Sequence, residues 1–297
     1  MLNPKMDVLD LFWRFVFERQ NIWYKKEVLK QPYPWTKDKI LAYYKFTNVY
    51  RRLDKGTLYV TDKIITENRK KIPAELFFNI IIYRIFNRIA TYDFIGYQAL
   101  EGFDYKKLQK QLDSYKESGG KIFTSAFMVT ASLFVDKTHI KHHKYCLALD
   151  IIFKNIEDLY KRCSKSKTMR ECHEHLVRCP GLGDFLSYQI MLDAMYANIL
   201  PFKEDDWTIA GAGSRRGLSY IYGKISKRQE LETFRWLRYN QRAEFKRLGL
   251  DFKFLDGKDI NLANIQNSCC EWGKWYKAYK GIGRPRVLYK QKIGDVS

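Results

Sequence analysis

Glycine, acidic and basic residues are concentrated between Thr168 and Leu218, in an order that suits chemistry on a nucleic acid. The segment holds a Pro-Gly-Leu-Gly hairpin at 180–183, the acidic pair Asp205 and Asp206, and a glycine-rich basic run at 211–217. A tight glycine turn exposes backbone N–H groups, and such groups at a helix start bind phosphate oxygens. A carboxylate nearby in the chain can accept a proton. The pattern therefore indicates a phosphate-binding turn beside a general base.

Several of these signals also have a purely structural explanation. A Gly-x-Gly turn between helices often marks close packing rather than a ligand. Arg51 and Arg52 lie at a predicted helix end beside Asp54, where they form either a solvated end or a phosphate clamp. Arg84 and Arg88 fall in a very apolar helix, so they line a cleft or belong to a satisfied polar network.

The elements that must position these residues are predicted to be helices. Apolar spacing, proline positions and capping residues predict helices over 5–30, 36–52, 74–90, 104–117 and 145–163. Two more flank the hairpin, one starting after Thr168, with Glu171 as its capping-box partner, and one at Asp184. The run 211–217 reads as a turn, and 122–134 fits helix and strand equally. We expect a mainly α fold.

Composition limits the partners of the chain. The 297 residues include 53 basic and 33 acidic ones, for a formal net charge of +20, and 46% are hydrophobic. So basic a chain usually meets a polyanion, and both nucleic acid and an anionic membrane qualify. No apolar run reaches membrane-spanning length, and the N-terminus lacks a secretory pattern. We expect a soluble intracellular protein with no membrane partner.

The cysteines and histidines suggest a metal site only weakly. Five of them follow the spacing C-x8-C-H-x-H-x3-C, at Cys163, Cys172, His173, His175 and Cys179. Structural zinc sites usually contain closely spaced cysteine pairs, which are missing from this pattern. We expect no metal and no cofactor, and reduced thiols throughout.

Four segments carry a resemblance to known proteins. The hairpin helix that leads to Asp206 resembles the helix-hairpin-helix DNA glycosylase superfamily, whose catalytic aspartate faces a flipped nucleotide. The segments PWTKDKIL with FTNVYRRLD, GAGSRRG and IQNSCCEWGKWYKAYKG stand at 34–41, 46–54, 211–217 and 265–281. Together they resemble the α-glutamyl/putrescinyl thymine pyrophosphorylase group of bacteriophages, and the helical module named with 5-hydroxymethyluracil DNA kinases. The likeness runs from about Leu11 to Arg286.

The resemblance implies a two-lobed, glycosylase-like helical fold and a step in thymine hypermodification. The whole chain, 1–297, would be one such unit, with lobes at 1–135 and 136–280 and a basic tail at 281–297. It would act as a transferase in the cytoplasm of a phage-infected host. An amino acid or polyamine would displace pyrophosphate from the 5-methylene of pyrophosphorylated 5-hydroxymethyluracil in DNA.

The residues can be assigned to that reaction by their chemistry. Asp206 is the preferred base, and Asp205 or Glu271, beside Lys274, are the alternatives. Cations and glycines suited to the pyrophosphate are Arg51, Arg52, Gly211, Gly213, Arg215 and Arg216. Gly181 and Gly183 would contact the DNA backbone, whereas Trp35, Trp207, Gln266 and Asn267 would stack on or bond to the base.

Two other functions remain open from the sequence. The chain has no G-x-x-x-x-G-K-[ST] motif, so phosphorylation of 5-hydroxymethyluracil would belong to a separate P-loop DNA kinase with a functional link to this chain. The chain could instead be a non-catalytic DNA-binding module that partners such a kinase. It could also be a glycosylase that excises a base.

Overall fold

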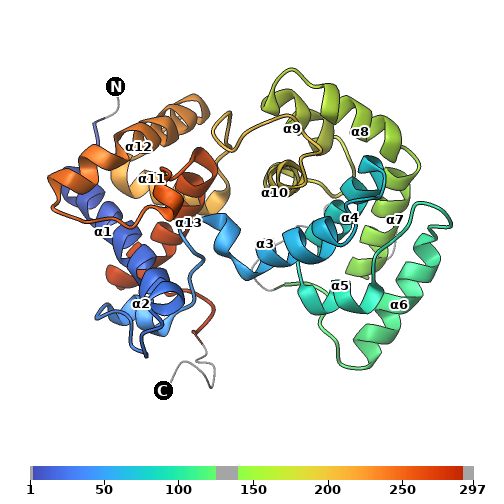
Figure 1. Cartoon of the computed structure of the whole chain (residues 1–297), viewed down its shortest axis with the longest axis horizontal. Coiled ribbons are helices and arrows are strands. Elements are labelled where there is room, and N and C mark those ends of the chain that lie inside the picture. Colours follow the sequence, from blue (N-terminus) through green and yellow to red (C-terminus); the bar gives the residue numbers. More distant parts are fainter. Residues whose placement is uncertain (1–2, 125–139, 290–297) are drawn as a thin grey trace. The chain divides into compact units, whose positions relative to one another are not determined.

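The computed structural model describes residues 3–124 and 140–289, and all regular elements in these ranges are helices (Figure 1). The one β pairing described there is an isolated antiparallel bridge between Tyr44 and Leu288. A mainly α fold is therefore confirmed. Among the helices of the described residues, none has the length and apolar character needed to cross a membrane.

The chain divides into two compact units, each described separately below. Unit 1 comprises Met1–Asp54 and Glu204–Ser297, and unit 2 comprises Lys55–Lys203. The boundaries thus lie after residues 54 and 203, whereas the sequence suggested lobes that meet at 135. The difference arises because the N-terminal helix packs against helices from the C-terminal third of the chain. No signal in the local sequence reports that pairing.

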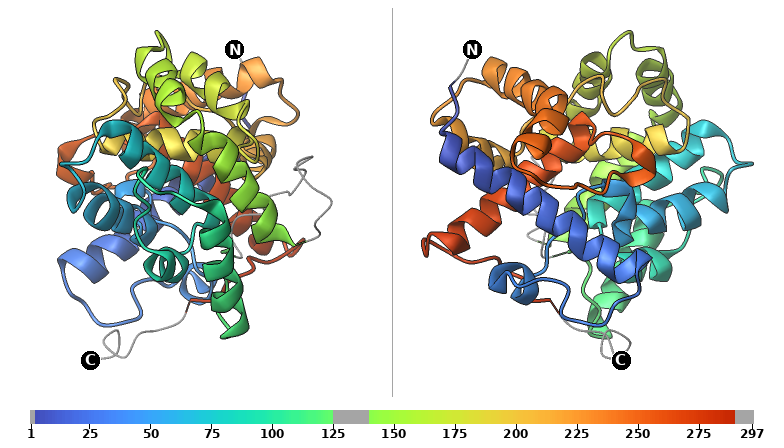
Figure 2. Two further views of the ribbon diagram at one scale, coloured as in Figure 1. Left: turned by 90° about the vertical axis from the view of Figure 1, so that its right-hand side faces the viewer. Right: turned by 60° about the vertical axis from the view of Figure 1, so that its left-hand side comes forward.

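Unit 1 is built around helix α13. Its elements are α1 (Met6–Trp23), the π-helix η1 (Tyr24–Val28), α2 (Lys39–Tyr43), the 3-10 turn η2 (Arg51–Leu53), α11 (Ala212–Tyr222), α12 (Lys227–Arg247), the 3-10 turn η4 (Leu255–Gly257) and α13 (Leu262–Tyr279). Helices α1, α11 and α12 each pack against α13 (Figure 2, right). Their core is aromatic. Phe12, Trp13 and Trp272 are fully buried, and Phe12 contacts each of the two tryptophan rings edge to face.

Unit 2 is centred on the apolar helix α4. Its elements are α3 (Lys55–Tyr59), η3 (Val60–Thr66), α4 (Pro73–Phe86), α5 (Ile89–Ile95), α6 (Tyr105–Glu117), α7 (Lys141–Phe153), α8 (Ile156–Lys165), α9 (Met169–Val177) and α10 (Asp184–Tyr196). Pro73 occupies the first turn of α4, and the helix is buried from Ala74 to Phe86. Helices α7, α8 and α10 pack around it.

Most of the predicted helices are present. The helix expected over 5–30 is α1 followed by η1, and the one over 104–117 is α6, with Asp104 as its N-cap. The helix over 74–90 ends early, because Asn87 adopts a left-handed conformation between α4 and α5. The helix over 145–163 is two helices, α7 and α8, separated at Lys154 and Asn155. Most of the undecided segment 122–134 lies outside the described residues.

The helix predicted over 36–52 is wrong for most of its length. Only α2 is α-helical there, and its N-cap is Asp38, whose side chain accepts from the backbone N–H groups of Ile40 and Leu41. From Tyr44 the chain leaves the helix and runs without regular structure until the 3-10 turn η2. The Lys45 N–H donates to the carbonyl of Val287, and the Thr47 N–H donates to a side chain of α13. Tertiary hydrogen bonds thus replace the helical ones.

The glycine-rich run 211–217 is helical rather than a turn. Gly211 is the N-cap of α11, and the rest of the run forms its first turns. Glycine disfavours a helix interior by roughly 1 kcal/mol relative to alanine, so close packing must compensate for this cost.

Candidate functional site

Helices α11 and α13 of unit 1 approach so closely that they leave no room for side chains at their crossing. A Cβ atom added to Gly217 would lie 2.0 Å from the carbonyl oxygen of Cys269, and one added to Gly213 would lie 2.3 Å from the Sγ of Cys270. Gly273 faces both glycines from α13. These glycines therefore fix the distance between two helices that carry candidate site residues.

The extended segment after α2 is tied to α13 by side-chain hydrogen bonds. Glu271 is 5% exposed, and its Oε2 accepts from the Thr47 N–H at 3.0 Å. The Nδ2 of Asn267 donates to the Oγ1 of Thr47 at 3.0 Å and to the carbonyl of Asn48 at 3.2 Å. The Asn264 Oδ1 accepts from the Arg51 N–H at 2.9 Å. The segment FTNVYRRLD is thus held along one face of α13.

Two charged residues complete this network. The Nε of Arg19 donates to the Thr47 carbonyl at 2.9 Å, and its Nη2 donates to the Oδ1 of Asn48 at 2.7 Å. The Oδ1 of Asp54 accepts from the Asn48 N–H at 2.8 Å. Burial raises the pKa of Asp54 to about 6, although Asn48, Arg19 and Arg51 act in the opposite direction. Burial also lowers the pKa of Arg19, against the pull of Asp54 and Glu271. The network therefore joins one cation to two carboxylates.

One end of the network reaches solvent through Lys274. Its Nζ lies 2.6 Å from the Oε1 of Glu271, and its side chain is 41% exposed, against 7% for Glu271. The neighbouring Cys270 thiol has its pKa raised to about 11 by burial and Glu271, whereas Lys274 and Arg216 lower it. The exposed Arg216 of α11 thus lies near the same end. A buried carboxylate thus pairs there with one accessible cation, and a second accessible cation acts on the neighbouring thiol.

The two aspartates of the acidic pair lie in different surroundings from Glu271. Asp205 accepts from the Nε and Nη2 of Arg238 at 3.0 and 3.1 Å, and from the Leu262 N–H at 2.8 Å. It therefore holds α12 to the start of α13. Asp206 is exposed in the turn that precedes Trp207. Both belong to unit 1.

The remaining arginines predicted to bind pyrophosphate have partners within unit 1. Arg215 pairs with the buried Glu230 and also donates to the carbonyl of Ala210 at 3.2 Å. Arg52 pairs with Asp256 on the surface. The side chain of Arg51 is buried beside α13. The structure therefore does not gather these three at one anion site, whereas Arg216, like Lys274, lowers the pKa of the Cys270 thiol.

The residues predicted to recognise a base are mostly buried. Trp35 is 5% exposed, and its indole N–H donates to the carbonyl of Gln31 at 2.7 Å. Gln266 is 4% exposed, and its Nε2 donates to the Oγ of Ser214 at 3.2 Å. Trp207 is half-buried. Only Asn267 joins the network around Glu271.

The hairpin expected to contact the DNA backbone lies in unit 2, between α9 and α10. The Oγ1 of Thr168 accepts from the Glu171 N–H at 3.1 Å, as predicted, but the Glu171 carboxylate accepts from Lys167 rather than returning the bond to Thr168. Gly181 has a φ of +79°, and Gly183 is the N-cap of α10. The helix pair and its glycine turn are therefore present.

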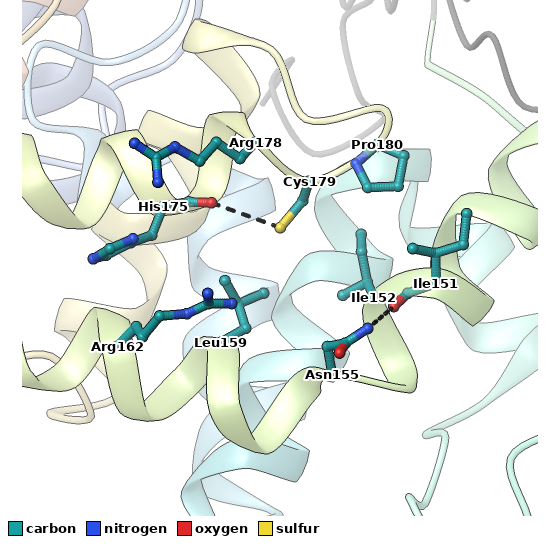
Figure 3. A pocket seen from close by; sticks show the side chains of 9 residues that line it. All are labelled: Ile151, Ile152, Asn155, Leu159, Arg162, His175, Arg178, Cys179 and Pro180. Carbon is teal, nitrogen blue, oxygen red and sulfur yellow. Dashed lines mark hydrogen bonds between the residues drawn. The ribbon is translucent and has the colours of Figure 1, made fainter.

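A small pocket adjoins this hairpin within unit 2. Figure 3 shows the basic residues Arg162, His175 and Arg178 on one side, and Ile151, Ile152 and Pro180 on the other. The Cys179 Sγ lies 3.8 Å from the His175 carbonyl oxygen. The pocket thus offers positive charge next to the exposed glycine turn.

Sequence reasoning missed the residues that surround Glu271. Arg19, Thr47, Asn48 and Asn264 were not among the candidates, and Asp54 was noted only as a neighbour of two arginines. A signal existed for Arg19, because it is a basic residue in a helix whose other face is strongly apolar. No local pattern links residue 19 to residues 47 and 271.

Comparison with known proteins places the chain in a family. The family model described as "5-hmdU DNA kinase, helical domain" matches residues 6–282. A curated relative, the 5-hmdU DNA kinase of Bacillus phage SP10, is 29% identical over 313 aligned residues, which cover 97% of this chain and 49% of the relative. The chain thus spans about half the length of that relative. No solved structure matches it. The chain belongs to the family of 5-hmdU DNA kinase helical domains.

Proposed function

We propose that this chain is an amine:DNA transferase that acts on pyrophosphorylated 5-hydroxymethyluracil in DNA. Glu271 carries the proposal: it is a buried carboxylate held by a backbone N–H and by a lysine that reaches solvent. The segments that build its surroundings are those that resemble the thymine pyrophosphorylase group. The family name and the phage relative support a substrate derived from 5-hmdU.

The reaction substitutes one group at the 5-methylene carbon. The nitrogen of the amine forms a bond to that carbon while the bond from carbon to the pyrophosphate oxygen breaks, and its electron pair leaves with pyrophosphate. The nitrogen then carries one proton too many, which a carboxylate accepts. Glu271 is the proposed acceptor in place of the previously preferred Asp206. Asp205 is a weaker candidate because Arg238 already occupies both of its oxygens.

The leaving group needs positive charge as it departs. Lys274 and Arg216 fit this role because both are accessible and both lie near Cys270. Preorganised cations stabilise charge that develops in a transition state, and loss of one such donor typically costs about a hundredfold or more in rate. When Lys274 turns toward pyrophosphate, Glu271 is released to accept the proton.

The basic charge of the chain and the α9–α10 hairpin fit binding to a DNA backbone. The glycine turn at Gly181 and the exposed start of α10 at Gly183 suit a phosphate, with Arg162 and Arg178 close by. The enzyme would act on a base that is flipped out of the duplex. Trp207 remains the proposed stacking partner, since it is not fully buried.

A second candidate is a DNA-binding module that assists a kinase without catalysis of its own. It is favoured by one observation: the relative that this chain matches, over 49% of that relative's length, is named a kinase. The sequence contains no P-loop motif, so the phosphorylation step would require another protein or domain. This candidate predicts salt-sensitive DNA binding that does not depend on Glu271.

The two candidates are separated by a nucleoside analysis. DNA that contains 5-pyrophosphoryloxymethyluracil is incubated with the protein and with amino acids or polyamines, then digested and analysed by mass spectrometry. We expect a nucleoside that carries the amine, together with one pyrophosphate per substitution. Bound DNA with no such nucleoside would support the module, and alkali-labile abasic sites would support a glycosylase.

Matched variants test the role of Glu271. Glu271→Gln keeps the size of the side chain and its acceptor oxygen, and we expect a rate loss of about a hundredfold or more with DNA binding retained. Lys274→Met should also slow the reaction. The control is Glu232→Gln, which breaks the exposed Arg228–Glu232 pair on α12 and should leave the rate unchanged. Equal rates for Glu271→Gln and the control would exclude Glu271 as the base.

A further inference from the structure

Three metal-binding side chains converge between α6 and α7 of unit 2, away from the residues used above. The Nε2 of His142 and the Nε2 of His143 each lie 2.7 Å from the same oxygen, the Oδ1 of Asp113. All three atoms lie within 4.8 Å of one another. Asp113 comes from the second half of α6, and the two histidines come from the first turn of α7.

The two histidines are not expected to meet by chance. Neighbouring residues on a helix point in different directions, about 100° apart, and do not normally face one partner. Here both rings turn their Nε2 atoms to one carboxylate oxygen, with ring centroids 4.6 Å apart and planes at 83°. One histidine would satisfy a structural hydrogen bond. The second adds a further nitrogen donor directed at the same point.

The cluster is protected on one side and accessible on the other. The side chain of His142 is 4% exposed, that of His143 17% and that of Asp113 35%. The carboxylate therefore reaches solvent while one imidazole is held in the core. This gradient gives an ion a path of entry and two ligands whose positions are fixed by packing.

We propose that Asp113, His142 and His143 form a binding site for a divalent metal ion of the zinc class. Two imidazole nitrogens and a carboxylate oxygen are ligands that suit Zn²⁺ and its neighbours in the first transition series. The ion takes the place between Nε2 and Oδ1 that a proton occupies in the hydrogen-bonded form. Donor atoms of a tetrahedral zinc site lie about 3.3 Å apart, so the ring–oxygen distances must open from 2.7 Å by about 0.6 Å to admit the ion.

The ion would join α6 to α7 and retain an open position. Three protein ligands leave at least one coordination site for water or a substrate oxygen, as in catalytic zinc sites. The carboxylate of Asp113 neutralises only one of the two positive charges of the ion, so the bound ion adds positive charge to unit 2. This site is independent of the proposed transferase reaction, which uses residues of unit 1.

Metal content is the direct test. The full-length protein is dialysed against a chelator and then equilibrated with Zn²⁺, and bound zinc is measured by elemental analysis. A parallel titration with Co²⁺ follows the visible absorption that reports nitrogen and oxygen ligands. We expect one tightly bound ion per chain, and a rise in melting temperature with Zn²⁺ because the ion binds the folded state.

Variants locate the ion. His143→Ala is preferred because its side chain is the more exposed of the two imidazoles, and Asp113→Asn keeps the shape of the carboxylate. Each should weaken Zn²⁺ binding by more than roughly tenfold and remove the thermal shift, with helical circular dichroism unchanged. His175→Ala is the control, since His175 belongs to the alternative cysteine and histidine pattern.

Three outcomes would overturn the proposal. The first is a wild-type chain that retains no zinc after equilibration. The second is zinc binding that survives both His143→Ala and Asp113→Asn unchanged. The third is binding that is lost in His175→Ala instead, which would place the ion among Cys163, Cys172, His173, His175 and Cys179.

Discussion

Both units of this protein bury an acidic side chain beside a basic one, but the two pairs differ in what surrounds them. In unit 2, Asp193 is fully buried and receives two hydrogen bonds from Arg84, whose side chain is 5% exposed. In unit 1, Glu271 is paired with Lys274, whose side chain is 41% exposed. The first pair is closed to solvent, whereas the lysine of the second reaches solvent.

The comparison separates a pair that only joins two helices from the pair proposed to take part in the reaction. Arg84 and Asp193 join α4 to α10. Each charged group gives the other a hydrogen-bond partner that the apolar surroundings of the two helices do not provide. The sequence left open whether Arg84 lines a cleft or sits in a satisfied network, and the structure shows the network. Glu271, in contrast, shares its surroundings with Asp54 and Arg19 and keeps one oxygen near solvent-exposed charge.

The largest effect is expected from breaking the closed pair. Asp193→Ala leaves the Arg84 guanidinium buried without its carboxylate, and the free energy of unfolding should fall by about 3–5 kcal/mol. Urea denaturation measures the loss. Arg84→Met combined with Asp193→Leu removes both charges and should recover most of it. If the single variant unfolds like the wild type, the pair contributes little and the comparison fails.

The next effect concerns the helix crossing that positions Glu271. Gly217→Ala places a Cβ against the backbone oxygen of Cys269 and should cost about 3 kcal/mol, because backbone cannot move aside cheaply. Gly213→Ala meets a side chain instead, the Sγ of Cys270. Adding Cys270→Ala should therefore relieve Gly213→Ala and leave Gly217→Ala unrelieved. If Cys270→Ala restored the same amount of stability to both glycine variants, the two contacts would not differ as described.

The third effect is a pH dependence confined to unit 1. Asp54 has an ordinary pKa of 3.8, raised to about 6 in the folded chain, so the folded state holds a proton that the unfolded state releases. Its contribution to stability is therefore present below about pH 4 and is lost as the pH rises to about 6. Asp54→Asn removes this titration.

That variant should gain about 3 kcal/mol relative to the wild type between about pH 4 and pH 7, measured by denaturation at each pH. Asparagine can still accept the Asn48 N–H, so the local fold is preserved. If the difference in stability between variant and wild type stayed constant across this pH range, the pKa of Asp54 would not be raised by burial in the folded chain.

Local sequence patterns were sufficient for most of the helices. Apolar spacing located α1, Pro73 marked the start of α4, and Thr168 and Asp184 marked the starts of the two helices around the hairpin. These signals depend on residues within one or two turns of each other, so they can be recognised without the fold. The net charge likewise depends on composition alone.

The segment 36–52 and the run 211–217 show where such patterns fail. The first leaves the helical conformation because Glu271, more than 200 residues away, accepts one of its backbone N–H groups. The second is helical despite its glycines because α13 packs directly against them. In both cases the deciding partner is distant in sequence, and its contribution outweighs local propensity.

The sequence by itself therefore determined that this is a basic, mainly helical chain, and that Glu271 and Lys274 are neighbours in one candidate segment. Only the tertiary structure decided that Arg19, Thr47 and Asp54 surround that carboxylate, and that Asp113 meets two histidines. The physical reason is that burial and hydrogen bonding between distant segments set the charge and accessibility of a side chain. Spacing along the chain sets only which side chains share a face.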